Sequence, residues 1–161
     1  MANNPAPYIA SVELLRDRIA DTNRYPYSIP VIRNLDRLEF HTPVTFFVGE
    51  NGTGKSTLLE AIAIAEGFNP EGGSRNFSFA TRESHSELSK CLRLSRSARR
   101  MQNFDGYFFR AESFFNVATE IDVKFPAYLG AYGGRSLHEQ SHGESFFALV
   151  SNRLQGNGVF F

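Results

Sequence analysis

Cysteine and tryptophan are scarce in this chain of 161 residues, which has one cysteine, Cys91, and no tryptophan. A single cysteine cannot form an internal disulfide, so the composition argues against a disulfide-stapled secreted protein and predicts a reducing, cytoplasmic location. The formal net charge is zero, which excludes a whole-chain attraction to nucleic acid or to an anionic membrane. No apolar run approaches the roughly 20 residues that cross a bilayer, and the N-terminus has neither the basic nor the apolar stretch of a signal peptide. We therefore expect no membrane part.

Hydrophobic residues are plentiful, at 42% of the chain with sixteen phenylalanines, enough for a packed core. The length predicts one domain over residues 1–161, with 1–7 as a flexible lead. Apolar patterns predict strands at 8–15, 32–40, 44–48, 106–111 and 159–161, and helices at 56–66, 113–121 and 145–154. The stretch 77–101 fits a strand or one basic helix face equally well.

The most informative segment is GENGTGKS at 49–56. It follows the apolar run 44–48, which we expect to be a central strand buried on both faces, and it leads into the helix. Strand, glycine loop and helix over 44–66 are the context of a phosphate-binding P-loop, in which backbone N–H groups and the helix N-terminus face the phosphates. Lys55 is expected to reach the β- and γ-phosphates, and the Ser56 hydroxyl to bind Mg²⁺. The predicted nucleotide-binding residues here are Gly49, Glu50, Asn51, Gly52, Thr53, Gly54, Lys55, Ser56 and Thr57.

A second loop, QSHGE at 140–144, precedes an apolar helix. It resembles the signature loop of ABC-type ATPases, and the wording of the first loop is typical of the same class. Three further phrases, GFNPEGG at 67–73, FRAESF at 109–114 and SHGE at 141–144, are similar to those of the predicted AAA/ABC-type ATPases without membrane domains, relatives of the SMC and RecF heads. This resemblance runs from about residue 25 to the end.

The resemblance implies an α/β fold: part of a P-loop NTPase head, with a central parallel sheet, flanking helices and an antiparallel β/helical lateral segment. It implies binding of ATP and Mg²⁺ and a homodimer that sandwiches the nucleotide, with hydrolysis in the complete, dimerised protein. In the segment 135–154, Ser141 would donate to the γ-phosphate held by the partner head, and Gly143 would allow close approach. The alternative is that Ser141 and Glu144 form only a helix capping box, and both interpretations can hold.

Two more site residues follow from the family pattern. An aromatic residue upstream of the loop stacks on adenine in such heads, and Tyr25 or Tyr27 stands at that distance. The family's Gln-loop position falls on Glu112, for which an ion pair with Arg110 is the simpler explanation. The Asp-Glu pair that completes the Mg²⁺ site and activates water has no counterpart before the sequence stops at Phe161, so we expect a truncated chain that binds nucleotide without turning it over.

Other functions compete with this interpretation. His138 and His142 with Glu139 match HExxH, the zinc-protease signature, but Gly143 and the capping pattern oppose one helix through the motif. A basic stretch suggests DNA contact, although such runs are usually solvated faces: Lys90, Arg93, Arg96, Arg99 and Arg100. A nucleotide-driven dimerisation switch without hydrolysis is a third class, and small-molecule kinases share only the first loop.

Overall fold

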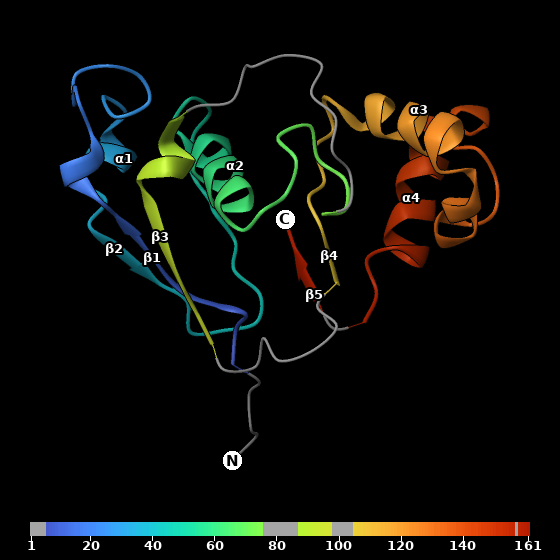
Figure 1. Ribbon diagram of the computed structural model, residues 1–161, viewed down its shortest axis with the longest axis horizontal. Helices are drawn as coiled ribbons and strands as arrows, with labels where there is room; N and C mark the ends of the chain where they lie inside the picture. The colour runs from blue at the N-terminus through green and yellow to red at the C-terminus, as the bar shows by residue number, and fades with distance from the viewer. Residues whose placement is uncertain (1–5, 76–86, 98–104, 157) are drawn as a thin grey trace. The chain divides into compact units, whose positions relative to one another are not determined.

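The computed structural model describes residues 6–75, 87–97, 105–156 and 158–161. The chain forms two compact units, each built from two stretches of sequence. The first comprises Met1–Gly67 and Glu83–Asn103, and the second Phe68–Arg82 and Phe104–Phe161. Both mix helices with strands, as an α/β chain requires (Figure 1).

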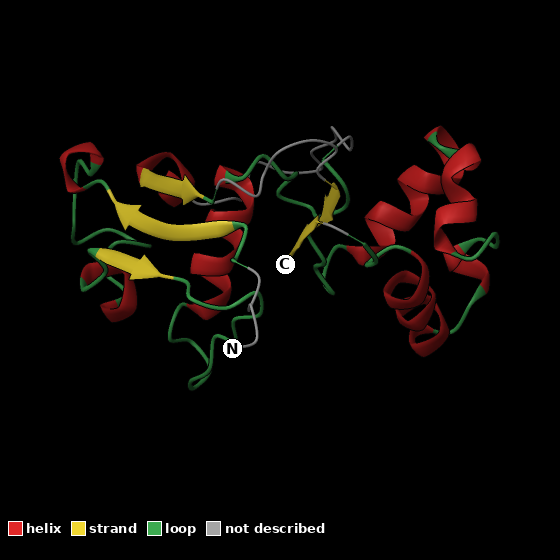
Figure 2. Ribbon diagram, turned by 90° about the horizontal axis from the view of Figure 1, so that it is seen from below, coloured by secondary structure: helices red, strands yellow, loops and turns green. Residues whose placement is uncertain are grey.

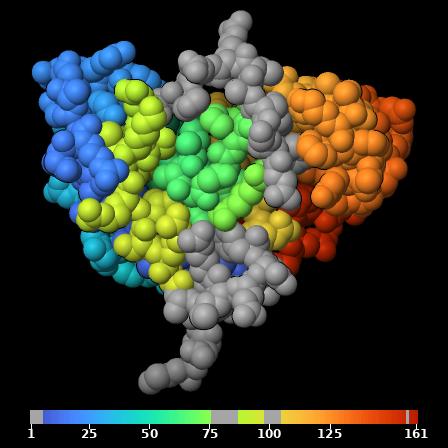
Figure 3. All heavy atoms as spheres, viewed as in Figure 1, coloured from blue at the N-terminus to red at the C-terminus, as the bar shows by residue number. Residues whose placement is uncertain are grey.

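The first unit contains a three-stranded antiparallel sheet of order β2-β1-β3, whose strands lie side by side in Figure 2. The central strand β1 (Ile9–Leu14) pairs with β2 (Arg37–Glu39) and β3 (Leu92–Arg96). The helix α2 (Lys55–Ala65) lies against β3, and their side chains adjoin on the face seen in Figure 3. Three shorter helices complete this unit: η1 (Arg16–Arg18), α1 (Pro30–Arg33) and η2 (Glu87–Cys91).

The second unit holds two short parallel strands, β4 (Asp105–Tyr107) and β5 (Gly158–Phe160). Its helices are α3 (Phe114–Lys124), η4 (Pro126–Tyr132), η5 (Leu137–Glu139) and α4 (His142–Asn152). They enclose one apolar core formed by Tyr107, Phe114, Val117, Ala118, Ile121, Tyr132, Leu137 and Leu149. The helices α3 and α4, both predicted from the sequence, turn apolar residues into this core.

Most predicted elements are confirmed, including the strand at the start of the chain, the helices α2, α3 and α4, and the strand interpretation of 92–96. The predicted strand 32–40 is only partly right. Its first two residues end the helix α1, which begins at Pro30 with Ile29 extended before it, and only Arg37–Glu39 pairs as a strand. Proline at the first helical position is preset for helix, and that signal outweighs weak alternation.

The expectation of a buried central strand at 44–48 is wrong. These residues have no regular structure, and Val44, Phe46 and Val48 are 64%, 82% and 87% exposed. No backbone hydrogen bond joins them to another described segment. A strand needs a hydrogen-bonded neighbour. An apolar run without one is not a strand, however high the β-propensity of its residues. The parallel sheet therefore consists of β4 and β5 alone in the described chain.

Candidate functional site

The glycine loop 49–54 has the backbone freedom that a phosphate cradle needs. Gly49, Gly52 and Gly54 have φ of 150°, 80° and 95°, which other residues rarely adopt. Gly54 is the N-cap of α2 and supplies no side-chain acceptor. The first intrahelical bond runs from the Leu58 N–H to the Gly54 carbonyl at 2.9 Å. The N–H groups of the first turn therefore stay available at the positive end of the helix dipole.

The ammonium group of Lys55 lies inside this loop. It donates to the carbonyls of Gly49 and Glu50 at 2.9 and 2.6 Å, and to the Thr53 hydroxyl at 3.5 Å. An ammonium has three donors, and here all three are directed to acceptors of the loop itself. The loop thus holds a positive charge on neutral acceptors, which is a chemical fit for phosphate oxygens.

Ser56 and Thr57 follow in the first turn of α2. Ser56 is exposed, so its hydroxyl is free to reach a ligand beside the loop. A serine oxygen beside a phosphate-binding loop suits Mg²⁺. This cation is usually bound by one or two protein oxygens together with the phosphate oxygens of its substrate. The residues present therefore fit a magnesium–nucleotide, and in such a complex the cation would neutralise phosphate charge.

The two upstream tyrosines have different surroundings. The Tyr25 hydroxyl lies 3.3 Å from the Thr57 hydroxyl, and its ring is 63% exposed. The Tyr27 hydroxyl lies 3.3 Å from the Cys91 sulfur, away from the loop residues. Burial, followed by the bond to Cys91, raises the pKa of Tyr27. Of the two predicted adenine platforms, Tyr25 is the one whose hydroxyl faces a residue of the loop's helix.

The second loop is capped as the sequence predicted. The Ser141 hydroxyl accepts from the Glu144 N–H at 3.4 Å and donates to the Glu144 carboxylate at 2.7 Å, and the Ser141 N–H donates to the same carboxylate. This is a complete capping box at the start of α4. The two bonds from Ser141 also hold the pKa of Glu144 below its usual range.

Gly143 has no structural reason to be glycine. A Cβ there would meet no atom within 4 Å, and its φ is not in the left-handed region. A side chain would thus project into open space beside the helix N-terminus.

Glu112 and Arg110 form a loose ion pair of 3.9 Å in which Glu112 is 79% exposed. The Arg110 guanidinium also donates to the Pro70 carbonyl at 2.9 Å. The solvated pair expected from the sequence is therefore what the structure contains. This geometry neither supplies nor excludes a Gln-loop role.

The HExxH motif does not form the helix that a zinc protease requires. Leu137–Glu139 is a separate turn, Gln140 is extended, and α4 begins only at His142. Both histidines flank the ring of Phe115, at centroid distances of 5.7 Å for His138 and 4.8 Å for His142. Among the described residues, no three His, Cys, Asp or Glu side chains gather as a metal site would need.

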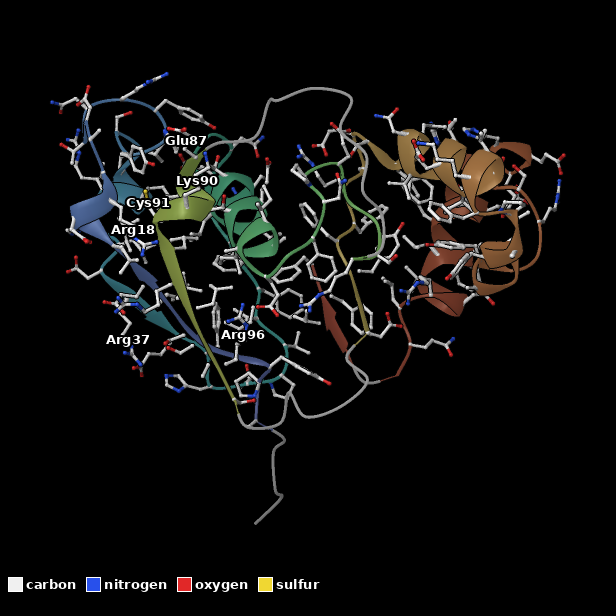
Figure 4. The ribbon with its side chains drawn as sticks, in the orientation of Figure 1. Arg18, Arg37, Glu87, Lys90, Cys91 and Arg96 are labelled. Atoms are coloured by element: carbon white, nitrogen blue, oxygen red, sulfur yellow. The ribbon has the colours of Figure 1, made fainter. Side chains whose placement is uncertain are left out.

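The described cations of the basic stretch are paired with carboxylates. Lys90, Arg93 and Arg96 lie on η2 and β3, and each pairs with a carboxylate, of Glu87, Glu13 and Glu66 respectively. Figure 4 labels Lys90 and Arg96 at opposite ends of this segment, with Glu87 near Lys90. Arg99 and Arg100 lie outside the described residues. The prediction of DNA contact stays a prediction.

The first unit thus brings together the loop 49–57 and Tyr25, while Glu112, Ser141 and Gly143 belong to the second unit. Sequence reasoning missed two residues, Ile29 and Val31. Their methyl groups lie 2.9 and 3.0 Å from where a Cβ on Gly54 would stand. Nothing in their identity signals this, because isoleucine and valine near Pro30 look like ordinary core residues.

A glycine loop around a lysine at the start of a helix, in a chain that mixes α and β, defines the class of P-loop ATPases. The comparison with known families agrees: the chain belongs to the AAA domain family, which matches residues 27–127, well over half of its length. Its function is accordingly nucleotide binding of the ATPase type. No curated protein and no solved structure matches the chain. No described helix is long and apolar enough to span a bilayer.

Proposed function

We propose that this chain binds Mg²⁺–ATP in the loop 49–57 as part of an ABC-type head, related to those of SMC and RecF proteins, that dimerises around the nucleotide. The arrangement of Lys55 supports this most directly. Its ammonium sits within the loop on neutral acceptors, at 2.6 and 2.9 Å for the two carbonyls. Phosphate oxygens are stronger acceptors than carbonyls because they carry charge.

Within the proposed site, each group has one role. Lys55 binds the β- and γ-phosphates, and the uncapped N–H groups of α2 face the phosphate chain. The Ser56 hydroxyl holds Mg²⁺, which supplies neutralisation of the phosphate charge. Tyr25 lies beside Thr57 at the edge of this site. Both compact units belong to one ATPase domain in this proposal.

The second loop serves a partner head. The helix α4 begins at His142 and Gly143, and the open space at Gly143 supports close approach of a phosphate to this helix N-terminus. Ser141 then acts on the γ-phosphate held by the other copy. In this role the Ser141 hydroxyl turns its one proton from the Glu144 carboxylate to the phosphate, while its oxygen keeps accepting from the Glu144 N–H.

Nucleotide-driven dimerisation needs no turnover, so a switch without hydrolysis is the second form of the proposal. Measuring phosphate release beside dimerisation separates the two forms. Dimerisation without release identifies the switch.

The test pairs Lys55→Ala with Ser141→Asp. Calorimetry should show that Lys55→Ala loses Mg²⁺–ATP binding by at least about a hundredfold, because a charge-assisted phosphate contact is removed. Ser141→Asp keeps a capping acceptor but sets a negative charge against phosphate. It should therefore bind ATP as the wild type does and fail to dimerise with ATP in analytical ultracentrifugation.

Lys124→Ala is the matched control, since this lysine is exposed and pairs with Glu120 on its own helix. It should bind and dimerise normally. If Lys55→Ala and Ser141→Asp both behave like this control, the assignment of the two loops is wrong.

A further inference from the structure

Residues 25–31, here called the strap, run across the start of the phosphate loop's helix. At one end the Tyr25 hydroxyl lies 3.3 Å from the Thr57 hydroxyl. Further along, Ile29 and Val31 press on Gly54, so closely that a Cβ there would meet Ile29 Cγ2 at 2.9 Å and Val31 Cγ1 at 3.0 Å. The strap thus contacts both the last glycine of the loop and the first turn of α2.

The strap is itself held in place. Its backbone is bonded within the segment, with the Ile29 N–H donating to the Pro26 carbonyl at 3.1 Å and the Ser28 N–H donating to the Arg24 carbonyl at 3.0 Å. The Tyr27 hydroxyl lies 3.3 Å from the buried Cys91 sulfur. Figure 4 shows Cys91 beside Arg18, where its sulfur also faces the Arg18 carbonyl at 3.6 Å. Because these bonds fix the strap, the strap can restrict the residues that it contacts.

Gly54 is the residue of the loop whose backbone conformation the strap can restrict. It has a left-handed φ of 95° and caps α2 without a side chain of its own. Glycine loses more conformational freedom on ordering than any other residue. Contact with two β-branched side chains, which have few rotamers, restricts that freedom before any ligand arrives.

We infer that the strap presets the phosphate loop from outside, and that Ile29 and Tyr25 are positioning residues for the phosphates of the nucleotide. Ile29 acts through Gly54, and Tyr25 acts through the Thr57 hydroxyl. This inference rests on the proposed function of the loop. It differs from the sequence prediction for Tyr25, which assigns that ring to the base.

A ligand without a base distinguishes the two roles. Mg²⁺–tripolyphosphate offers the phosphates alone, whereas Mg²⁺–ATP offers phosphates and adenine. Both are titrated calorimetrically into the wild type, Ile29→Ala and Tyr25→Phe. Tyr25→Phe keeps the ring and removes only the hydroxyl that faces Thr57, and since Tyr25 is exposed this variant folds normally.

Preorganisation by the strap predicts equal losses for the two ligands. Ile29→Ala should weaken both by about tenfold, and Tyr25→Phe should weaken both by about threefold. Ile19→Ala and Tyr128→Phe are the matched controls, a half-buried isoleucine just after η1 and an exposed tyrosine on η4, and both should bind like the wild type.

Three outcomes would contradict the inference or its basis. A loss confined to ATP overturns the positioning role, because the substituted group would then act on the nucleoside part of the ligand and not on its phosphates. Unchanged affinity of Ile29→Ala and Tyr25→Phe for both ligands overturns the strap as a whole. A wild type that binds neither ligand overturns the proposed function of the loop, and the inference with it.

Discussion

Asp105 and Arg153 form the most specific side-chain pair of the second unit. Both oxygens of Asp105 accept from the guanidinium of Arg153, at 2.6 and 2.7 Å. Arg153 also lies over the Tyr107 ring, 5.7 Å from its centroid. The hydrogen bonds from Arg153 lower the pKa of Asp105, and the same bonds raise the pKa of Arg153. The pair joins β4 to the end of α4.

This pair predicts an acid-sensitive contribution to stability. Because the pKa of Asp105 is lower in the folded chain, the stabilisation is complete above the unfolded value of about 3.9 and is lost as the pH falls below it. Asp105→Asn should therefore flatten the decline in unfolding free energy below about pH 4, measured by urea denaturation at a series of pH values.

Arg153→Lys is the informative companion, since it keeps a cation but cannot make the two parallel bonds. It should give a slope between those of the wild type and Asp105→Asn. If the acid dependence of Asp105→Asn equals that of the wild type, the pair does not contribute in the way its geometry implies.

The contact between α2 and β3 includes the carboxylate of Glu66, whose negative charge is unfavourable in its position. Glu66 follows the last residue of α2, where the negative end of the helix dipole opposes a negative charge, and its side chain is only 1% exposed. The Arg96 guanidinium donates to it at 2.8 Å from the end of β3. The arginine thus compensates a buried charge at the far end of the phosphate loop's helix.

Arg96→Leu should destabilise the protein by about 2 kcal/mol, because it leaves Glu66 buried without this partner. Arg93→Leu on the same strand removes an exposed pair with Glu13 and should cost less than about 0.5 kcal/mol. Chemical denaturation of both variants measures the difference. Equal costs would show that burial of Glu66 is not what makes Arg96 important.

Elements defined by local signals were predictable from the sequence. The helix α2 follows its glycine loop and α4 follows its capping box, as their residue patterns indicated. These signals lie within a few residues of the element they specify, so no knowledge of the rest of the fold is needed.

Strands were less predictable because pairing depends on distant residues. The run 44–48 is apolar and β-branched, yet no described neighbour pairs with it. The same reason explains what was missed at the site. A motif names the loop residues, but the contact of Ile29 with Gly54 joins positions 25 residues apart and has no local signature.

At the scale of the whole molecule, zero net charge coincides with an exposed apolar stretch. Equal numbers of acidic and basic residues remove long-range repulsion between copies near neutral pH. Val44, Phe46 and Val48 offer an apolar surface to other copies. Self-association should therefore be greatest near about pH 7 and weaken on either side.

Dynamic light scattering across pH checks this expectation. Phe46→Glu should suppress the association near neutral pH, because it adds charge and interrupts the exposed stretch. Val123→Glu adds the same charge at an exposed position on α3, in the other unit, and is the control. Suppression by both variants alike would assign the effect to net charge and not to residues 44–48.

The engagement of Lys55 by its own loop has a consequence for how ligands are chosen. A ligand binds to this ammonium only if it offers stronger hydrogen-bond acceptors than the two carbonyls and the hydroxyl that the ammonium already contacts. Adenosine brings none, whereas inorganic sulfate and phosphate bring several. Ligand binding in the loop therefore depends on the exchange of these hydrogen bonds. Common anionic buffers compete with the nucleotide in any solution used to study it.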